Sequence, residues 1–249
     1  MTANLRKILV KLKQKSNNNP DKMVRIQRGP LKGFLWLLSI SDSRYILGTY
    51  EEGQTDLILK EMKSSKSFAD FGANSGYYSL MVKKMYSNAE VFMFEPLPKN
   101  IQIIENHFKA NFSEQNYHLD PCAVGNMNGT IEFTDSGNDS ANTYKKESSM
   151  HEFGEKIEVQ ITKLDDLAEK YNWDSSIFMK VDIEGAEEDF LQGGLNFLRK
   201  FKPKMILATH DTHVPGVEKA CLDIATDLGY QFEVINDDKI KGQVDYLLF

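Results

Sequence analysis

This sequence has very little cysteine and no excess of positive charge. It has 249 residues but only two cysteines, Cys122 and Cys221, and neither stands in a CxxC or zinc-binding spacing. This usage fits a reducing compartment, so we expect a cytoplasmic protein. The net charge is −6 and the pI is near 5.5. Because nucleic-acid binders usually present basic surfaces to the phosphates, we expect no nucleic-acid partner.

Long apolar runs are missing as well. No stretch of the sequence is long and apolar enough to be a transmembrane segment. Residues 5–12 have leucine and isoleucine at helical spacing among basic residues, without the apolar core and cleavage site of a signal peptide. We expect a helix that packs on the domain, with peripheral membrane contact by residues 1–15 as the alternative.

The pattern of predicted elements divides the chain near residue 65. Residues 1–65 are predicted to be an N-terminal extension with a helix, a hairpin and a short helix capped by Thr55. Residues 66–249 alternate short apolar segments with amphipathic ones, which predicts a mostly parallel sheet with helices on both faces. The last two strands have only a polar turn between them, so the sheet should end in an antiparallel hairpin. A Rossmann-like, seven-stranded α/β sheet that ends in this way is typical of class I methyltransferases.

A glycine turn follows the first strand of this domain, in the stretch FADFGANSGYYSL, residues 68–80. Glycines in such a turn allow the backbone to approach a ligand closely. A dinucleotide site would show GxGxxG here, whereas this turn has Asp70 at the strand tip and Asn74 in place of a glycine. A carboxylate at this point repels a pyrophosphate and suits a cationic group such as an amino-acid ammonium.

A second acidic residue ends the next predicted strand, EVFMFEP. Glu95 lies 25 residues after Asp70, and its carboxylate can accept hydrogen bonds from both hydroxyls of a ribose. Two acids on adjacent strand tips, with a glycine turn between them, predict S-adenosylmethionine as the cofactor. The adenine is expected near the end of the third strand, around residues 120–123.

Four stretches together resemble the FkbM family of S-adenosylmethionine-dependent methyltransferases: FADFGANSGYYSL, FMFEPLPKN, DPCAVGNMNGT and FMKVDIEGAEEDFLQGG. The resemblance implies a class I methyltransferase fold and O-methylation of a hydroxyl, commonly on a sugar or natural product. Family members often have Glu-x-His at the end of the fifth strand, where this chain has Ala208, Thr209 and His210. The positions carried over, with those at the strand tips, give the predicted cofactor contacts: Asp70, Gly72, Ala73, Asn74, Gly76, Glu95, Pro96, Cys122, Ala123 and Asp182.

Acids and histidines follow the fourth and fifth predicted strands, in KVDIEGAEE and THDTH. Asp182 is expected at the strand tip, on the same face as Lys180 and Glu184. Histidine is the side chain most easily poised as a base near neutral pH. We therefore predict that Asp182 and His210 are catalytic. A divalent metal is not required by the pattern, but its expected ligands are Asp182, His210 and Asp211.

Other polar and aromatic residues have two interpretations. Glu187 and Glu188 fall in the first turn of a helix, where they either favour the helix dipole or belong to the site. His213 and the polar loop of residues 137–144 either contact a ligand or are only structural. Aromatic residues of the extension either cover the site or, as we expect, belong to the core: Phe34, Trp36, Tyr45 and Tyr50.

These observations favour a cytoplasmic O-methyltransferase of FkbM type, with a saccharide, glycosylated metabolite or natural product as its small-molecule or glycan acceptor. One alternative is a binding module that keeps the fold without catalysis, which Ala208 in place of the family glutamate leaves open. A second alternative is an NAD-linked oxidoreductase. A nucleic-acid methyltransferase is disfavoured by the charge and by the lack of an Asn/Asp-Pro-Pro-Tyr tetrapeptide for a flipped base.

Overall fold

The computed structural model describes residues 21–40, 42–114, 116–135, 143–145, 154–238 and 242–249. The predicted N-terminal helix over residues 5–12 and most of the loop of residues 137–144 lie outside these ranges. Within the described ranges, no helix has both the length and the apolar character needed to cross a membrane.

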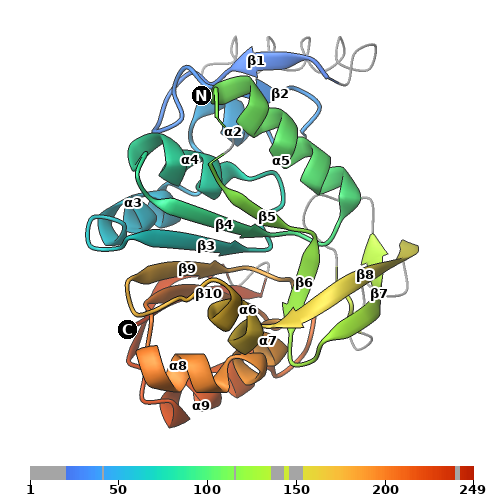
Figure 1. The fold of residues 1–249 in the computed structure, drawn as a ribbon, viewed down its shortest axis with the longest axis vertical. Coiled ribbons are helices and arrows are strands. Elements are labelled where there is room, and N and C mark those ends of the chain that lie inside the picture. Colours follow the sequence, from blue (N-terminus) through green and yellow to red (C-terminus); the bar gives the residue numbers. More distant parts are fainter. Residues whose placement is uncertain (1–20, 41, 115, 136–142, 146–153, 239–241) are drawn as a thin grey trace.

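The centre of the fold is a seven-stranded sheet in the order β11-β12-β10-β9-β3-β4-β5 (Figure 1). Strands β10, β9, β3, β4 and β5 are parallel neighbours, and β12 is antiparallel to both β10 and β11. This arrangement confirms the predicted sheet and its closing hairpin. The strand bounds are β3 (Ser67–Phe71), β4 (Glu90–Phe94), β5 (His118–Asp120), β9 (Ile177–Val181), β10 (Met205–His210), β11 (Phe232–Asp238) and β12 (Gln243–Leu248).

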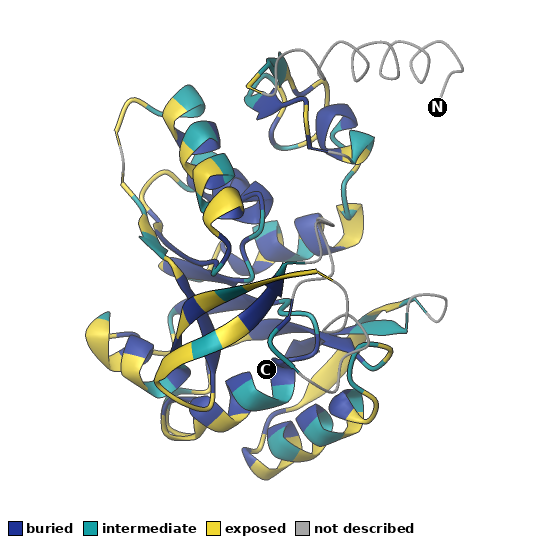
Figure 2. Cartoon of the chain, turned by 90° about the vertical axis from the view of Figure 1, so that its right-hand side faces the viewer, coloured by how far each residue is buried: buried dark blue, intermediate teal, exposed yellow. Residues whose placement is uncertain are grey.

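Helices cover both faces of this sheet, which explains why its inner strands are short apolar runs without polar alternation. In β3, for example, Phe68 packs into one hydrophobic cluster and Ala69 into the cluster on the opposite face. Figure 2 shows buried strands between helices whose outer sides are exposed. One face is covered by α3 (Glu52–Glu61), α4 (Tyr77–Met85) and α5 (Pro98–Asn111), and the other by α6 (Leu164–Lys170), α7 (Glu187–Gly193), α8 (Leu195–Phe201) and α9 (Val217–Asp227).

A second, three-stranded sheet consists of β6 (Cys122–Gly125), β8 (Glu155–Lys163) and β7 (Gly129–Asp135), in that order. Strands β7 and β8 pair antiparallel. Residues 120–123, expected near the end of the third strand, span the end of β5 and the start of β6. Pro121 separates β5 from β6, and because proline has no N–H to donate, the ladder of the large sheet stops there.

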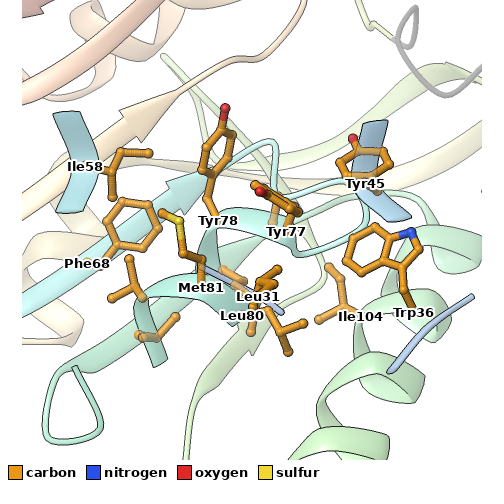
Figure 3. Packing of buried hydrophobic residues seen from close by; sticks show 14 of the residues in the cluster. Leu31, Trp36, Tyr45, Ile58, Phe68, Tyr77, Tyr78, Leu80, Met81 and Ile104 are labelled. Atoms are coloured by element: carbon orange, nitrogen blue, oxygen red, sulfur yellow. The ribbon is translucent and has the colours of Figure 1, made fainter. Parts of the chain in front are cut away.

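The described part of the N-terminal extension packs against α4 and α5. Its hairpin, β1 (Met23–Arg25) and β2 (Leu35–Leu37), confirms the prediction, and the helix α2 (Ser43–Leu47) was not predicted. Figure 3 shows side chains of the extension in one cluster with those of α4 and α5. The segments before and after residue 65 therefore share one hydrophobic core. The division of the chain into two domains at this residue stays a prediction.

The predicted cap of the short helix is wrong. Helix α3 begins at Glu52 rather than after Thr55. Thr55 lies inside the helix, and its hydroxyl donates to the carbonyl of Tyr50 at 3.3 Å. A threonine hydroxyl that can bond backward to a preceding carbonyl is compatible with a helix interior, so residue type alone does not fix the cap.

His107 on α5 connects the extension to the glycine turn. Its Nε2 accepts a hydrogen bond from the N–H of Leu37 at 3.0 Å, and its Nδ1–H donates to the carbonyl of Ser75 at 2.9 Å. The ring of Trp36 stacks on the imidazole with 3.9 Å between the centroids. Because burial penalises the charged ring, the pKa of His107 is lowered to about 4.

This burial predicts a pH-dependent stability. His107 has a pKa of 6.5 in the unfolded chain and about 4 in the folded chain. Between these two pH values, the unfolded chain binds a proton that the folded chain does not bind. The free energy of unfolding should therefore fall as the pH falls through this window. Relative to His107→Gln, which does not titrate, we expect the wild type to lose about 2 kcal/mol between pH 7 and pH 5. Urea unfolding at both pH values measures the difference, and the same change in both proteins would contradict the prediction.

Candidate functional site

A cavity of about 830 Å³ lies at the carboxyl ends of the parallel strands. Ligands of open α/β sheets bind at this edge. Gly76 instead faces α5, where an added Cβ would lie 3.2 Å from Ile104. The other nine predicted cofactor contacts line the cavity: Asp70, Gly72, Ala73, Asn74, Glu95, Pro96, Cys122, Ala123 and Asp182.

The glycine turn passes directly against the end of β9. Gly72 has φ +77°, and a Cβ at this position would lie 2.0 Å from the carbonyl oxygen of Asp182. Glycine is therefore required here by both the backbone conformation and the space. Two hydrogen bonds hold the turn on the tip of β4: the N–H groups of Gly72 and Ala73 donate to the carbonyl of Phe94 at 3.0 and 3.2 Å.

Glu95 follows β4 and connects this turn to the next one. Its Oε2 accepts a hydrogen bond from the N–H of Asn74 at 2.8 Å, and its Oε1 accepts one from the N–H of Leu97 at 3.0 Å. Burial raises the pKa of Glu95 to about 7, although both amides act in the opposite direction. Each carboxylate oxygen can accept a further hydrogen bond, so the side chain is able to bind a ligand hydroxyl.

Asp70 is the buried acid at the end of β3. Its Oδ2 accepts a hydrogen bond from the hydroxyl of Ser79 at 2.7 Å. Its Oδ1 has no hydrogen-bond partner among the residues that the structure describes. Burial raises the pKa of Asp70, while Lys180 and Ser79 lower it. An unpartnered, buried carboxylate oxygen at a cavity wall favours a donor from a ligand, and a cationic donor most of all.

Lys180 on β9 lies beneath the cavity among acidic side chains. Its Nζ donates to Oδ2 of Asp182 at 2.9 Å and lies 5.1 Å from the ring centroid of Tyr78. Burial by itself lowers the pKa of Lys180, but Asp182, Asp70 and Glu51 outweigh this effect and raise it. Lys180 is therefore a buried, permanently charged cation.

Five side chains at the tips of β9 and β10 form what we call the acid–histidine cluster: Asp182, Glu184, Glu187, His210 and His213. Nδ1 of His210 lies 2.8 Å from Oε1 of Glu187. Its Nε2 lies 3.4 Å from Oδ1 of Asp182 and 3.7 Å from Oε2 of Glu184. Burial lowers the pKa of His210, but these three carboxylates outweigh it and raise the pKa to about 10.

The structure brings Asp182 and His210 together, as the sequence predicts, but it leaves Asp211 out. Oδ1 of Asp211 accepts hydrogen bonds from the N–H groups of Gly216 and Glu218, at 2.9 and 3.3 Å, near the start of α9. Glu184 is in the cluster instead. Glu184 was expected on the same strand face as Lys180 and Asp182, and this expectation was wrong. Strand β9 ends at Val181, and Glu184 lies in the following turn with φ +55°.

Glu187, which the sequence left open between the helix dipole and the site, is a member of the cluster. It is fully buried, and its Oε1 accepts a hydrogen bond from the N–H of Gly185 at 3.0 Å. The same Oε1 lies 2.8 Å from Nδ1 of His210, so this histidine has a carboxylate partner although position 208 is Ala208. An acid in the first turn of a helix is common for electrostatic reasons, so nothing in the local pattern distinguished Glu187 from Glu188.

The extension forms the remaining wall of the cavity. Tyr45 and Tyr50 both line it, and their rings stack at 4.1 Å between the centroids. Trp36 is fully buried against His107, and Phe34 packs on Phe112. The prediction that these aromatic residues belong to the core is confirmed, since Trp36 and Tyr45 are buried in one cluster and Phe34 and Tyr50 pack against it. Tyr45 and Tyr50 cover the site as well.

Comparison with known proteins gives a family. Residues 70–232 match the Methyltransferase FkbM domain. The chain is 26% identical over 162 residues to Methyltransferase sdnD of Sordaria araneosa, covering 54% of this chain and 62% of that one. It is 28% identical over 142 residues to Methyltransferase 1 of Beauveria bassiana (strain ARSEF 2860), covering 50% of this chain and 56% of that one. The matched regions therefore span about six-tenths of these curated relatives.

Solved structures agree on the fold. A methyltransferase FkbM from Methylobacillus flagellatus KT has a TM-score of 0.52 at 17% identity, covering 75% of this chain and 44% of that one. An O-methyltransferase from Bacillus cereus in complex with SAH has a TM-score of 0.50 at 11% identity, covering 100% of this chain and 90% of that one. With the family match extending over more than half of its length, the chain belongs to the FkbM family of S-adenosylmethionine-dependent methyltransferases and has the class I methyltransferase fold.

Proposed function

We propose that this protein transfers the methyl group of S-adenosylmethionine to a hydroxyl oxygen of a saccharide, a glycosylated metabolite or a natural product. One observation carries the proposal: a single cavity joins Asp70 and Glu95, at the tips of β3 and β4, to the acid–histidine cluster at the tips of β9 and β10. The first pair suits the cofactor, and the cluster suits an acceptor hydroxyl.

The charges of the cavity support the cofactor assignment. Six carboxyl side chains line the described cavity wall, against the cations Arg44 and Lys180 and the imidazole of His210 with its raised pKa. S-adenosylmethionine carries a sulfonium and an ammonium, so it suits a negative cavity. We assign the ammonium to the unpartnered oxygen of Asp70 and the ribose hydroxyls to Glu95. The adenine then lies against Cys122 and Ala123, beyond the tip of β4.

Backbone groups complete this cofactor half. Gly72, Ala73 and Asn74 line the cavity along the glycine turn, where the missing Cβ of Gly72 lets the turn pack against the carbonyl of Asp182. Pro96 continues the wall after Glu95. Gly76 acts indirectly in this assignment, because it lets α4 start against Ile104 of α5 and so fixes the turn.

Methyl transfer is an in-line displacement. The hydroxyl oxygen attacks the methyl carbon, the carbon–sulfur bond breaks, and the sulfur keeps the electron pair as S-adenosylhomocysteine forms. The hydroxyl proton has to leave, so polar groups are needed beside the oxygen. Asp182 and His210 occupy that position in our proposal, and the rest of the site aligns the two reacting atoms.

The wall formed by the extension supports a hydroxylated, partly apolar acceptor. The stacked rings of Tyr45 and Tyr50 are followed by Tyr77, whose ring centroid lies 5.2 Å from that of Tyr50. Aromatic faces pack against the apolar side of a sugar or polyketide ring, and nearby charged groups such as Arg44 can bind its hydroxyls. The volume of about 830 Å³ is near the upper end of the range for small-molecule sites, so the cavity has space for an acceptor beside the cofactor.

Glu95 gives the first test. If the ribose hydroxyls donate to an ionised Glu95, S-adenosylhomocysteine should bind about tenfold more weakly at pH 6 than at pH 8, because the carboxyl with a pKa of about 7 must lose its proton. Glu95→Gln should bind at least tenfold more weakly at pH 8 and lose this part of the pH dependence. Isothermal titration calorimetry measures both, with Glu188→Gln as the matched control. Equal affinity and equal pH dependence in Glu95→Gln and wild type would contradict the assignment.

The reaction type is tested with S-adenosylmethionine that carries a trideuterated methyl group. Incubation with a panel of sugars, glycosides and hydroxylated natural products should yield products 17 Da heavier by mass spectrometry, with the label on oxygen. His210→Gln should lower turnover about 100-fold or more, because it replaces the imidazole beside the hydroxyl with an amide that cannot take up or pass on a proton. Asp211→Asn, outside the cluster, should keep most of the activity. Transfer to nitrogen or carbon, or binding of the cofactor without any product, would contradict O-methylation.

A further inference from the structure

Three members of the acid–histidine cluster present one ligand atom each to a common point. They are Asp182, Glu184 and His210, whose ligand atoms all lie within 4.8 Å of one another. Nε2 of His210 is 3.4 Å from Oδ1 of Asp182 and 3.7 Å from Oε2 of Glu184. Atoms that bind one metal ion at about 2.1 Å lie roughly 3–4 Å from one another. The spacing therefore suits a shared cation without rearrangement of the backbone.

The remaining atoms of two of these side chains are already held by other residues. Glu187 binds Nδ1 of His210 at 2.8 Å, which turns Nε2 toward Asp182 and Glu184. Lys180 binds Oδ2 of Asp182 at 2.9 Å, which leaves Oδ1 facing the histidine. A carboxylate that holds the far nitrogen of a histidine is the usual support of a histidine ligand in metal sites. The group is thus fixed in the orientation that a metal ion needs.

The charge of the acid–histidine cluster also favours a bound cation. Three carboxylates surround His210, and Lys180 is paired with one of them. His210 binds a metal ion only as the neutral imidazole, and a bound ion then replaces the positive charge of the proton that Nε2 gives up. Oε2 of the fully buried Glu187 has no hydrogen-bond partner among the described residues. A buried carboxylate oxygen without a partner is costly, even though the other oxygen of Glu187 is held by His210 and Gly185. A divalent cation would balance this excess of negative charge.

The backbone is also constrained at this point. Glu184 has φ +55°, a conformation that is uncommon for a residue with a side chain. The turn places its Oε2 3.0 Å from Nδ1 of His213 and close to His210. Unfavourable backbone conformations of this kind gather at functional sites, where the surrounding structure maintains them.

We propose that Asp182, Glu184 and His210 bind one divalent transition-metal ion, for which Mn²⁺ is the probe used below. Two carboxylates and one imidazole favour Mn²⁺ over Mg²⁺ and Ca²⁺, which prefer oxygen ligands alone. A bound divalent ion lowers the pKa of a hydroxyl that it coordinates. That use of the ion depends on the proposed O-methylation, whereas binding of the ion does not.

Binding is measured on the full chain after removal of metals with a chelator. MnCl₂ is titrated into the protein, and the free ion is followed by electron paramagnetic resonance. We expect one site per chain, and Mg²⁺ should displace Mn²⁺ only at a large excess. Glu184→Gln should lower the affinity for Mn²⁺ at least tenfold. Glu188→Gln removes one negative charge four residues away, where Glu188 contacts Gln192, and it should keep the wild-type affinity.

Two results would overturn the metal site: no binding of Mn²⁺ by the wild type, or the same affinity in Glu184→Gln and wild type. Circular dichroism and urea unfolding establish that the variants are folded. Calorimetry with S-adenosylhomocysteine on the metal-free protein separates this proposal from the proposed function. If the cofactor product binds and Mn²⁺ does not, the metal site fails and the methyltransferase assignment stands. If Mn²⁺ binds and the cofactor product does not, the metal site stands and the proposed methyl transfer fails.

Discussion

The buried charge of Lys180 is the constraint on which the site depends. Only 4% of its side chain is exposed, and an ammonium at such a position is stable only if carboxylates surround it. Asp182 binds it directly, while Asp70 from the neighbouring strand and Glu51 from the extension contribute at longer range. Because these acids must face one cation, the tips of β3 and β9 and the start of α3 converge on the same cavity.

More carboxylates converge there than Lys180 can neutralise. Asp70 keeps an oxygen without a partner in the described part of the chain, and so does Glu187 on the far side of His210. Both carboxylates are buried near the carboxyl ends of the strands. The negative charge of this region therefore comes from buried acids and not from acids exposed to water. The two proposals assign this excess to cationic ligands: the cofactor's ammonium at Asp70, and a metal ion beside His210.

The sequence predicts the features that depend on neighbours along the chain. Alternating apolar segments give the sheet, and strand-tip positions give Asp70 and Glu95, because the end of a buried strand is recognisable locally. Glu184 and Glu187 could not be assigned to the site in this way, and Asp211 was assigned to it wrongly. Their roles depend on the turn after β9 and on how α7 and α9 pack against β10, contacts that no periodicity records. The helix α2 is only five residues long, too short for a clear helical pattern.

The central claim is that the cofactor lies across the tips of β3 and β4 with its sulfur toward β9 and β10. A crystal structure of the protein with S-adenosylhomocysteine tests it most directly. The account predicts both ribose hydroxyls within about 3.2 Å of the Glu95 carboxylate, the amino group at Asp70, and the sulfur facing Asp182 and His210. A nucleoside bound elsewhere, or a sulfur directed away from the acid–histidine cluster, would contradict it.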